Sequence, residues 1–248
     1  MNRNSVRRAI KRILWRAGWD LVQFNPSTHT FARRARFLKN YQIDLVLDVG
    51  ANTGQYAKQI RELGYKGQIV SFEPLNSAVT ELRRAAERDD NWQVRHHACG
   101  AKDGEEIIHV AANSQSSSFL PMRSRHLQVF PDSRYVGKEL VEVKRLDTIF
   151  DEVASAHAKI WLKMDVQGFE TQVLEGATAI LHRIALIQTE VSLEPLYEGE
   201  TTFADILLFM KQRGFELIAL ESYLSDPATS HLLQVECIFH GSKCSLNK

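Results

Sequence analysis

The chain has 248 residues, of which 44% are hydrophobic, and this length and composition predict one large core in an α/β domain with small appendages. No apolar run approaches the length of a membrane span and no secretory signal pattern is present, so we expect a cytoplasmic protein. Cys99, Cys237 and Cys244 show neither C-x-x-C nor metal spacing, which indicates free thiols.

The formal net charge is only +1, but it is distributed unevenly. Residues 1–40 contain ten basic residues and one acidic residue, a net charge of +9, and the remainder of the chain therefore carries −8. An uneven charge distribution of this kind is informative about binding partners rather than about the fold. We treat residues 1–40 as a basic helical segment and residues 41–248 as the main domain.

Within the basic segment, residues 5–21 predict an amphipathic helix. Its apolar positions recur at helical spacing, with two tryptophans nearby: Ile10, Ile13, Leu14, Ala17 and Leu21, with Trp15 and Trp19. One interpretation is a helix that lies on anionic lipid at the inner face of the membrane. The other is a docking helix with a solvated charged face. A second short basic helix is predicted over residues 29–40.

From residue 45 onward, apolar strands alternate with helices, which predicts a mostly parallel sheet of Rossmann-like type. The predicted strands are 45–48, 69–73, 93–98, 159–165, 184–190, 215–220 and 232–239, and the helices are 54–63, 77–88, 170–181 and 203–211. The last two strands form a hairpin, so the final strand of the seven is antiparallel. Residues 105–111 and 140–145 are extra strands, and residues 112–139 are either a lid over the acceptor or a solvated insertion.

The first strand leads into a glycine turn, VLDVGANTG, at residues 46–54. The spacing is neither G-x-G-x-x-G nor that of a P-loop, and Asp48 before the turn would repel a pyrophosphate. An acid at that position suits a ligand with a cationic end, such as S-adenosylmethionine. Nineteen residues after Gly54, the second strand ends on Glu73, whose carboxylate can accept two ribose hydroxyls. The pattern looks like the first motif of a class I methyltransferase; the alternative is an ordinary βαβ turn.

Ligands of an open α/β sheet bind beyond the carboxyl ends of the strands, so polar residues at those ends are candidates. The third strand ends near Ala98 and Cys99, where an adenine is expected. Asp165 and Glu190 end the fourth and fifth strands, and together they could bind a divalent cation such as Mg²⁺, or one could be a general base. The alternative is a helix cap for Asp165 and an ion pair for Glu190.

Two further candidates have equally open roles. Lys163 lies on the same face of its strand as Asp165, where it could polarise the acceptor or form a structural ion pair. His231, in the loop before the last strand, could reach the pocket and act as a base.

The chain resembles the FkbM family of S-adenosylmethionine-dependent methyltransferases over about residues 45–240. The matching segments are LDVGANTGQYA (47–57), VSFEP (70–74), HACGAKDGE (97–105), SSSF (116–119), VKRLDTI (143–149), LKMDVQGFETQVLEGA (162–177) and IQTEVS (187–192). The segment from Lys163 to Ala177 is the most specific, and within it Gln167 stands where the family commonly has Glu.

The resemblance implies a class I methyltransferase fold and cofactor contacts from Asp48, Gly50, Asn52, Gly54 and Glu73. It places Asp165 beside the transferred methyl group. It also implies O-methylation of a hydroxyl on a sugar, glycolipid or polyketide-type product.

Two other functions are considered from the sequence. A nucleic-acid methyltransferase would use the basic N-terminus, but the residues after the fourth strand, Asp165-Val-Gln-Gly, are not the N/D-P-P-Y/F tetrad that methylates base amines, so we expect no nucleic-acid partner. A non-catalytic protein that only binds S-adenosylmethionine is disfavoured by the intact glycine turn and both strand-end acids.

Overall fold

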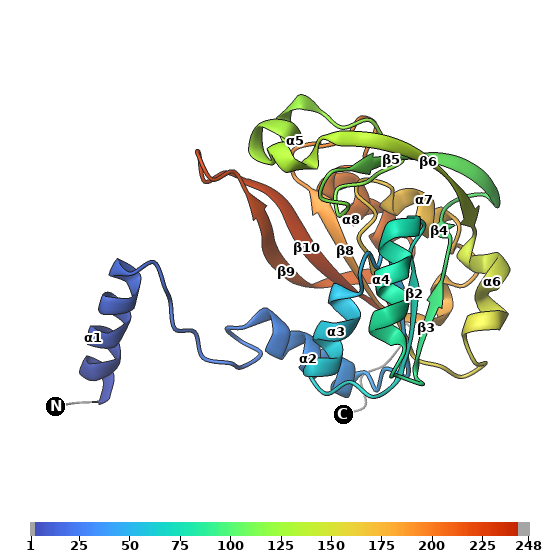
Figure 1. The fold of residues 1–248 in the computed structure, drawn as a ribbon. Helices are drawn as coiled ribbons and strands as arrows, with labels where there is room; N and C mark the ends of the chain where they lie inside the picture. The colour runs from blue at the N-terminus through green and yellow to red at the C-terminus, as the bar shows by residue number, and fades with distance from the viewer. Residues whose placement is uncertain (1–2, 243–248) are drawn as a thin grey trace.

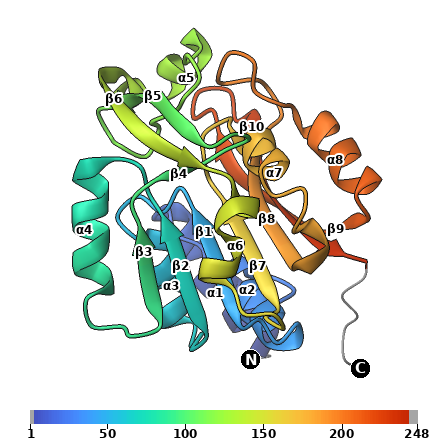
Figure 2. The same ribbon diagram turned by 90° about the vertical axis from the view of Figure 1, so that its right-hand side faces the viewer.

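The computed structural model describes residues 3–242, with side chains described from residue 7 onward, so Cys244 lies outside the described residues. Within that range a central sheet has helices on both faces, and a smaller sheet lies at one edge (Figures 1 and 2). The central strands are β1 (Leu45–Val49), β2 (Gln68–Phe72), β3 (Trp92–Arg95), β7 (Ile160–Met164), β8 (Ile184–Ser192), β9 (Phe215–Ser225) and β10 (Leu232–Gly241). The helices are α1 (Arg3–Arg16), α2 (Thr30–Asn40), α3 (Gln55–Glu62), α4 (Asn76–Ala86), α5 (Ser124–Val129), α6 (Leu146–Val153), α7 (Glu170–Glu175) and α8 (Phe203–Gln212), with 3-10 turns at Pro131–Ser133 and Leu181–Arg183.

The seven strands of the central sheet run in the order β3-β2-β1-β7-β8-β10-β9. Only β10 is antiparallel to its neighbours, β8 and β9, and the other pairings in this sheet are parallel. The predicted seven-stranded sheet with an antiparallel last strand is therefore confirmed. This is the strand order of class I methyltransferases.

Alternation along β1 explains why both faces of the sheet are covered. Leu45, Leu47 and Val49 pack into a core with α6, α7 and α8. Val46 faces the opposite core, which includes side chains of α2, α3 and α4. Because each face buries apolar side chains, every residue of β1 is buried, as in other parallel sheets covered by helices.

Several element boundaries differ from the sequence predictions, and two of the differences interrupt a predicted element. The third strand ends at Arg95, and Ala98–Cys99 instead form β4, which pairs with β6 (Tyr135–Lys144) and not with the central sheet. The helix predicted over 170–181 ends at Glu175, and the chain continues as a turn into the 3-10 segment. Apolar periodicity alone did not reveal these interruptions.

The extra strands form a sheet of their own. It has the order β4-β6-β5, with β5 at Gly104–Ala111, and Figure 2 shows it beside α4 at one end of the central sheet. Ile108 and Val141 pack there against Leu75 and Ala78, at the start of α4. Strand β6 begins at Tyr135, earlier than the predicted residue 140, so only residues 112–134 of the predicted irregular segment leave this sheet, and they carry α5.

The two basic helices are placed differently. α2 packs against the domain, where it buries Ala32, Arg34 and Leu38. α1 ends at Arg16, short of the predicted residue 21, and lies apart from the domain in Figure 1. No helix among residues 3–242 is long and apolar enough to cross a membrane.

Candidate active site

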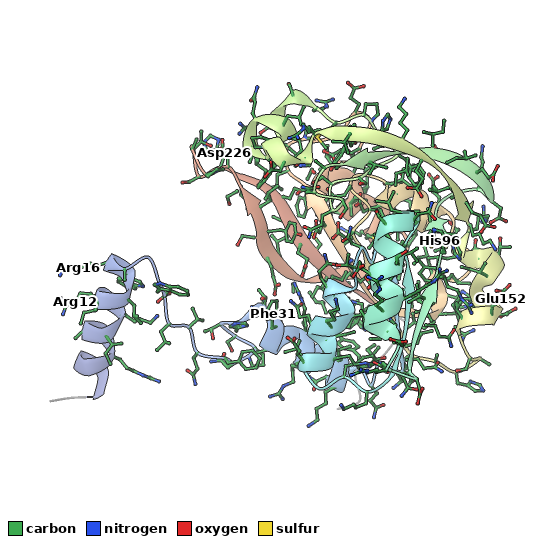
Figure 3. The ribbon with its side chains drawn as sticks, in the orientation of Figure 1. Arg12, Arg16, Phe31, His96, Glu152 and Asp226 are labelled. Atoms are coloured by element: carbon green, nitrogen blue, oxygen red, sulfur yellow. The ribbon has the colours of Figure 1, made fainter. Side chains whose placement is uncertain are left out.

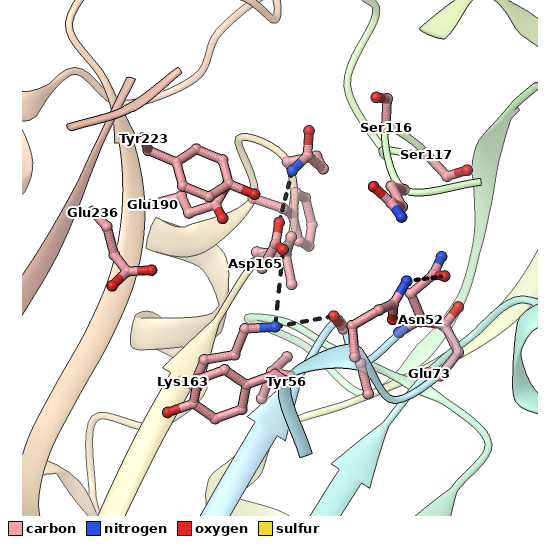
Figure 4. Close-up of a pocket in the computed structure, with 18 of the residues that line it drawn as sticks. Asn52, Tyr56, Glu73, Ser116, Ser117, Lys163, Asp165, Glu190, Tyr223 and Glu236 are labelled. Atoms are coloured by element: carbon pink, nitrogen blue, oxygen red, sulfur yellow. Dashed lines mark hydrogen bonds and ion pairs between the residues drawn. The ribbon is translucent and has the colours of Figure 1, made fainter. Parts of the chain in front are cut away.

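A cavity of about 570 Å³ lies at the carboxyl ends of the parallel strands. Its walls come from the β1–α3 turn, the ends of β2, β7 and β8, the β9–β10 hairpin, the segment 113–119 and the start of α2. Figure 4 shows side chains from these elements converging on it. The cavity is therefore assembled from segments that are far apart in the sequence.

The turn after β1 depends on a glycine at position 50. Gly50 has a φ of +74°, and a Cβ there would lie 1.9 Å from the backbone oxygen of Asp165. Only glycine fits this conformation and this approach of two chain segments. Asn52, two residues on, also has a positive φ and lines the cavity.

Glu73 follows β2 and is held by the backbone. Its Oε2 accepts a hydrogen bond from the Asn52 amide (2.8 Å) and its Oε1 accepts one from the Leu75 amide (2.9 Å). Burial raises the pKa of this carboxyl to about 7, although both amide bonds oppose the shift. Each oxygen keeps a second lone pair, so Glu73 can still accept hydrogen bonds from a ligand.

The structure does not bring Asp48 to the cavity. Its side chain is fully buried behind the cavity wall, where it pairs with Lys163 Nζ (3.1 Å) and accepts a hydrogen bond from Ser71 Oγ (3.1 Å). The parallel register aligns Asp48 with Lys163, so adjacent strands place both side chains on one face. Asp48 therefore supports the site from beneath, contrary to the expectation of a direct ligand contact.

Gly54 also lies outside the cavity lining. It has a φ of +84°, and a Cβ there would meet the ring of Trp92 at 2.8 Å. Its role in the structure is a close packing contact at the start of α3.

Ala98 and Cys99 do line the cavity, in β4 of the small sheet. Burial raises the pKa of the Cys99 thiol well above its usual range, so it stays protonated.

Asp165 reaches the cavity in a fixed orientation. Its Oδ1 accepts a hydrogen bond from Gln167 Nε2 (2.7 Å), and its Oδ2 lies 3.9 Å from Lys163 Nζ (Figure 4). The Gln167 Oε1 in turn accepts the hydroxyl proton of Tyr197 (2.7 Å), which is fully buried. No side-chain hydrogen bond caps the start of α7, and its first residue, Glu170, instead accepts from the amides of Val166 and Gly168 in the preceding turn. Asp165 is thus free of the structural role of a cap.

Lys163 is locked from below. Its ammonium donates to the Gly50 carbonyl (3.2 Å) and pairs with Asp48. Burial alone would lower the pKa of this lysine, but the carboxylates of Asp48 and Asp165 outweigh it and the pKa is raised. Lys163 therefore remains charged beside Asp165.

Glu190 lines the cavity next to Tyr223 (Figure 4). Burial, and then the neighbouring charge of Asp165, raise its pKa well above the usual range. Among the residues that the structure describes, its Oε2 has no hydrogen-bond partner. Burial thus disfavours the charged form of Glu190, and in its protonated form the carboxyl can donate a hydrogen bond into the cavity.

His231 lies outside the cavity. It is exposed near the tip of the β9–β10 hairpin, close to Asp226, which Figure 3 labels there. The expectation that it reaches the pocket is therefore not met. Across residues 3–242, no group of three or more His, Cys, Asp or Glu side chains could hold a metal ion.

Sequence reasoning missed a row of polar residues that crosses the sheet. Strand register aligns Glu190 of β8 with Glu236 of β10, and Glu236 with Glu221 of β9. Arg34 of α2 donates to Glu236 (2.5 Å) and lies 3.7 Å from Glu221. No local pattern links these residues, since Arg34 and Glu236 are 202 positions apart.

A second missed contact supports the middle of the site. Tyr56 of α3 donates its hydroxyl proton to Gln188 of β8 (2.8 Å), and both line the cavity. The Lys163 ammonium lies 5.4 Å from the centre of the Tyr56 ring.

Together, the strand order and a glycine turn beside two strand-end acids define a class I methyltransferase. The Methyltransferase FkbM domain matches residues 48–217, and the chain belongs to this family. The family and the fold imply S-adenosylmethionine as the methyl donor.

Two curated proteins are similar in sequence. The 2-O-methyltransferase NoeI of Sinorhizobium fredii is 30% identical over 182 residues, 71% of this chain and 73% of NoeI. Methyltransferase 1 of Beauveria bassiana is 24% identical over 144 residues, 53% of this chain and 57% of that protein. Among solved structures, TehB from Haemophilus influenzae has a TM-score of 0.47 at 10% identity, covering 85% of this chain and 60% of TehB.

Proposed function

We propose that this methyltransferase transfers a methyl group from S-adenosylmethionine to a hydroxyl of a neutral, sugar-type acceptor. The observation that carries the proposal is the Asp165 carboxylate, which reaches the cavity while Gln167 fixes one of its oxygens. The similarity to a protein named as a 2-O-methyltransferase supports oxygen as the atom that is methylated.

The donor would occupy the part of the cavity between the β1–α3 turn and the small sheet. Gly50 and Asn52 present backbone there, Glu73 would accept the ribose hydroxyls, and Ala98 with Cys99 would contact the adenine. When bound, the donor supplies a methyl group that its sulfonium already activates. The protein must then align the acceptor oxygen and remove its proton.

Asp165 is the proposed general base. Its Oδ1 is engaged by Gln167, so Oδ2 would receive the proton of the acceptor hydroxyl. Because burial disfavours the charged form of Glu190, this carboxyl would donate a hydrogen bond to the acceptor rather than compete for that proton. Two carboxyls in different environments can divide these roles.

We favour this arrangement over a magnesium site shared by Asp165 and Glu190. The Lys163 ammonium already supplies positive charge 3.9 Å from Asp165, and burial disfavours the charged form of Glu190 that a cation would need. Lys163 would thus hold the Asp165 side chain in place, without itself contacting the acceptor.

The charge of the lining indicates a neutral acceptor. Two cationic side chains, Arg34 and Lys163, face five carboxyls, and both are engaged by carboxylates. The cavity is therefore rich in hydrogen-bond acceptors for hydroxyl groups and unfavourable for a phosphate or a uronic acid. The carboxyls are Glu73, Asp165, Glu190, Glu221 and Glu236.

The test uses methyl-labelled S-adenosylmethionine and lipid and saccharide extracts of producing cells that lack the gene. We expect the wild-type chain to label a glycan that yields an O-methyl sugar after acid hydrolysis, and the matching glycan in cells with the gene to be one methylene heavier. Asp165→Asn should bind the donor in calorimetry but lose labelling. Label in nucleic acid, or donor binding without transfer to any extract, would contradict the proposal.

A further inference from the structure

We propose that the N-terminal segment 7–24, together with a cationic hollow beside α2, docks the protein on the surface of an anionic lipid bilayer. The inference goes beyond methyl transfer and does not depend on the identity of the acceptor. It starts from the distribution of exposed apolar side chains.

Exposed apolar side chains are concentrated in this one segment. Seven of the fifteen large hydrophobic side chains that the described structure exposes lie within residues 10–24. Trp19 is 72% exposed and Ile13 67%. The seven are Ile10, Ile13, Trp15, Trp19, Leu21, Val22 and Phe24. An exposed cluster of this kind marks an interaction site rather than ordinary surface.

Two cationic side chains of α1 lie opposite its apolar face. At 3.6 residues per turn, Ile10, Ile13 and Leu14 share one face, and Arg8 and Arg12 lie on the opposite one, whereas Arg7 borders the apolar face. Figure 3 shows Arg12 and Arg16 pointing away from the domain. A helix with an apolar face and a basic face suits the boundary between lipid headgroups and acyl chains.

A second observation extends the positive surface onto the domain. A hollow of about 600 Å³ lies where the segment meets the domain, and Phe24 is part of its lining. Arg36, Lys39 and Lys66 also line it and are exposed, and its lining contains no carboxylate. The hollow is therefore complementary to anionic headgroups.

The position of α2 connects this surface to the active site. Arg36 and Lys39 of α2 line the hollow, whereas Thr30, Phe31 and Arg34 of the same helix line the cavity. Docking through segment 7–24 would thus hold one wall of the cavity close to the bilayer. A bilayer is favoured over a second copy of the chain because the positive charge of α1 and the hollow would repel the same surface on another molecule.

The test is co-sedimentation of the full chain with phosphatidylcholine vesicles that contain or lack phosphatidylglycerol. We expect binding only to the anionic vesicles, and weaker binding at high salt. Arg8→Gln/Arg12→Gln should weaken binding about 30-fold, since each basic residue near an anionic surface contributes about 1 kcal/mol. Ile13→Gln/Trp19→Gln should also weaken vesicle binding, because it removes two exposed apolar side chains from the segment.

The matched control is Arg83→Gln/Arg88→Gln, which removes two exposed cations, one in the last turn of α4 and one just after it. It should bind as the wild type does, and all variants should bind S-adenosylmethionine equally. Equal sedimentation with neutral and anionic vesicles, or equal losses in the control and the α1 variants, would overturn the proposal. The proposal would also be overturned if the chain self-associated in sedimentation velocity through α1 and did not bind vesicles, because a second copy would then be the partner.

Discussion

The buried pair of Lys163 and Asp48 offers the most quantitative test of how the site is supported. Asp48 is fully buried, and the Lys163 ammonium lies 3.1 Å from its Oδ1 and 3.2 Å from the Gly50 carbonyl oxygen. Lys163→Met keeps the stem of the side chain and removes the ammonium. Asp48 would then lack a counter-charge in an environment that strongly disfavours an isolated carboxylate.

Breaking one side of a buried ion pair costs about 3–5 kcal/mol in the free energy of unfolding. Such a loss is a large fraction of the 5–15 kcal/mol, in round terms, that typically stabilises a domain. We therefore expect Lys163→Met to lower the urea midpoint strongly at unchanged m-value. It should also weaken donor binding, because the Gly50 turn loses its hydrogen bond to the ammonium.

A double variant separates the effect of the unpaired Asp48 charge on stability from the effect of altered packing. Asp48→Asn/Lys163→Met removes both charges, and the amide can still accept the hydrogen bond from Ser71 Oγ. It should recover most of the stability that the single variant loses. The reasoning would be refuted by a single variant within about 1 kcal/mol of the wild type, or by a double variant no more stable than the single one.

Four further predictions concern the cavity. Asp165→Asn should reduce turnover about 10²–10⁴-fold with little change in donor affinity, and the wild type should be insensitive to EDTA; loss of activity on chelation would instead indicate a metal at Asp165. Glu73→Ala should weaken donor binding by about 1.5–3 kcal/mol. The affinity of the wild type for the donor, measured by calorimetry, should rise as the pH passes about 7, because Glu73 ionises there. Glu73→Gln should show no such rise. Gln167→Glu places a like charge beside Asp165 and should move the acidic limb of the pH–rate profile to higher pH. Gln167→Met adds no charge, so it should lower turnover without that shift. Gly50→Ala should abolish donor binding in calorimetry and destabilise the fold, because the new Cβ would collide with the Asp165 carbonyl; a stable variant that binds the donor would show that the turn can relax.

The sequence by itself determined the class of fold and the position of the cavity. Alternating apolar strands and helices required a parallel sheet, and the ends of parallel strands meet at one edge. Local patterns therefore sufficed to indicate that Gly50, Glu73 and Asp165 lie along one cavity, and Asn52, which the family resemblance implied, also lines it. The signals that identify these residues are local as well, since a glycine in a tight turn and an acid directly after a strand are both visible in a short stretch of sequence.

Only the tertiary structure decided which polar residues face the ligand and which support it. The sequence made both Asp48 and Lys163 candidates for the site, but strand register pairs them so that Lys163 lines the cavity and Asp48 lies buried behind it. The row formed by Glu190, Glu236 and Glu221 arises from antiparallel pairing in the last three strands, and Arg34 reaches it from α2. Pairing register and helix docking depend on the packing of the whole chain, so no local window of sequence contains them.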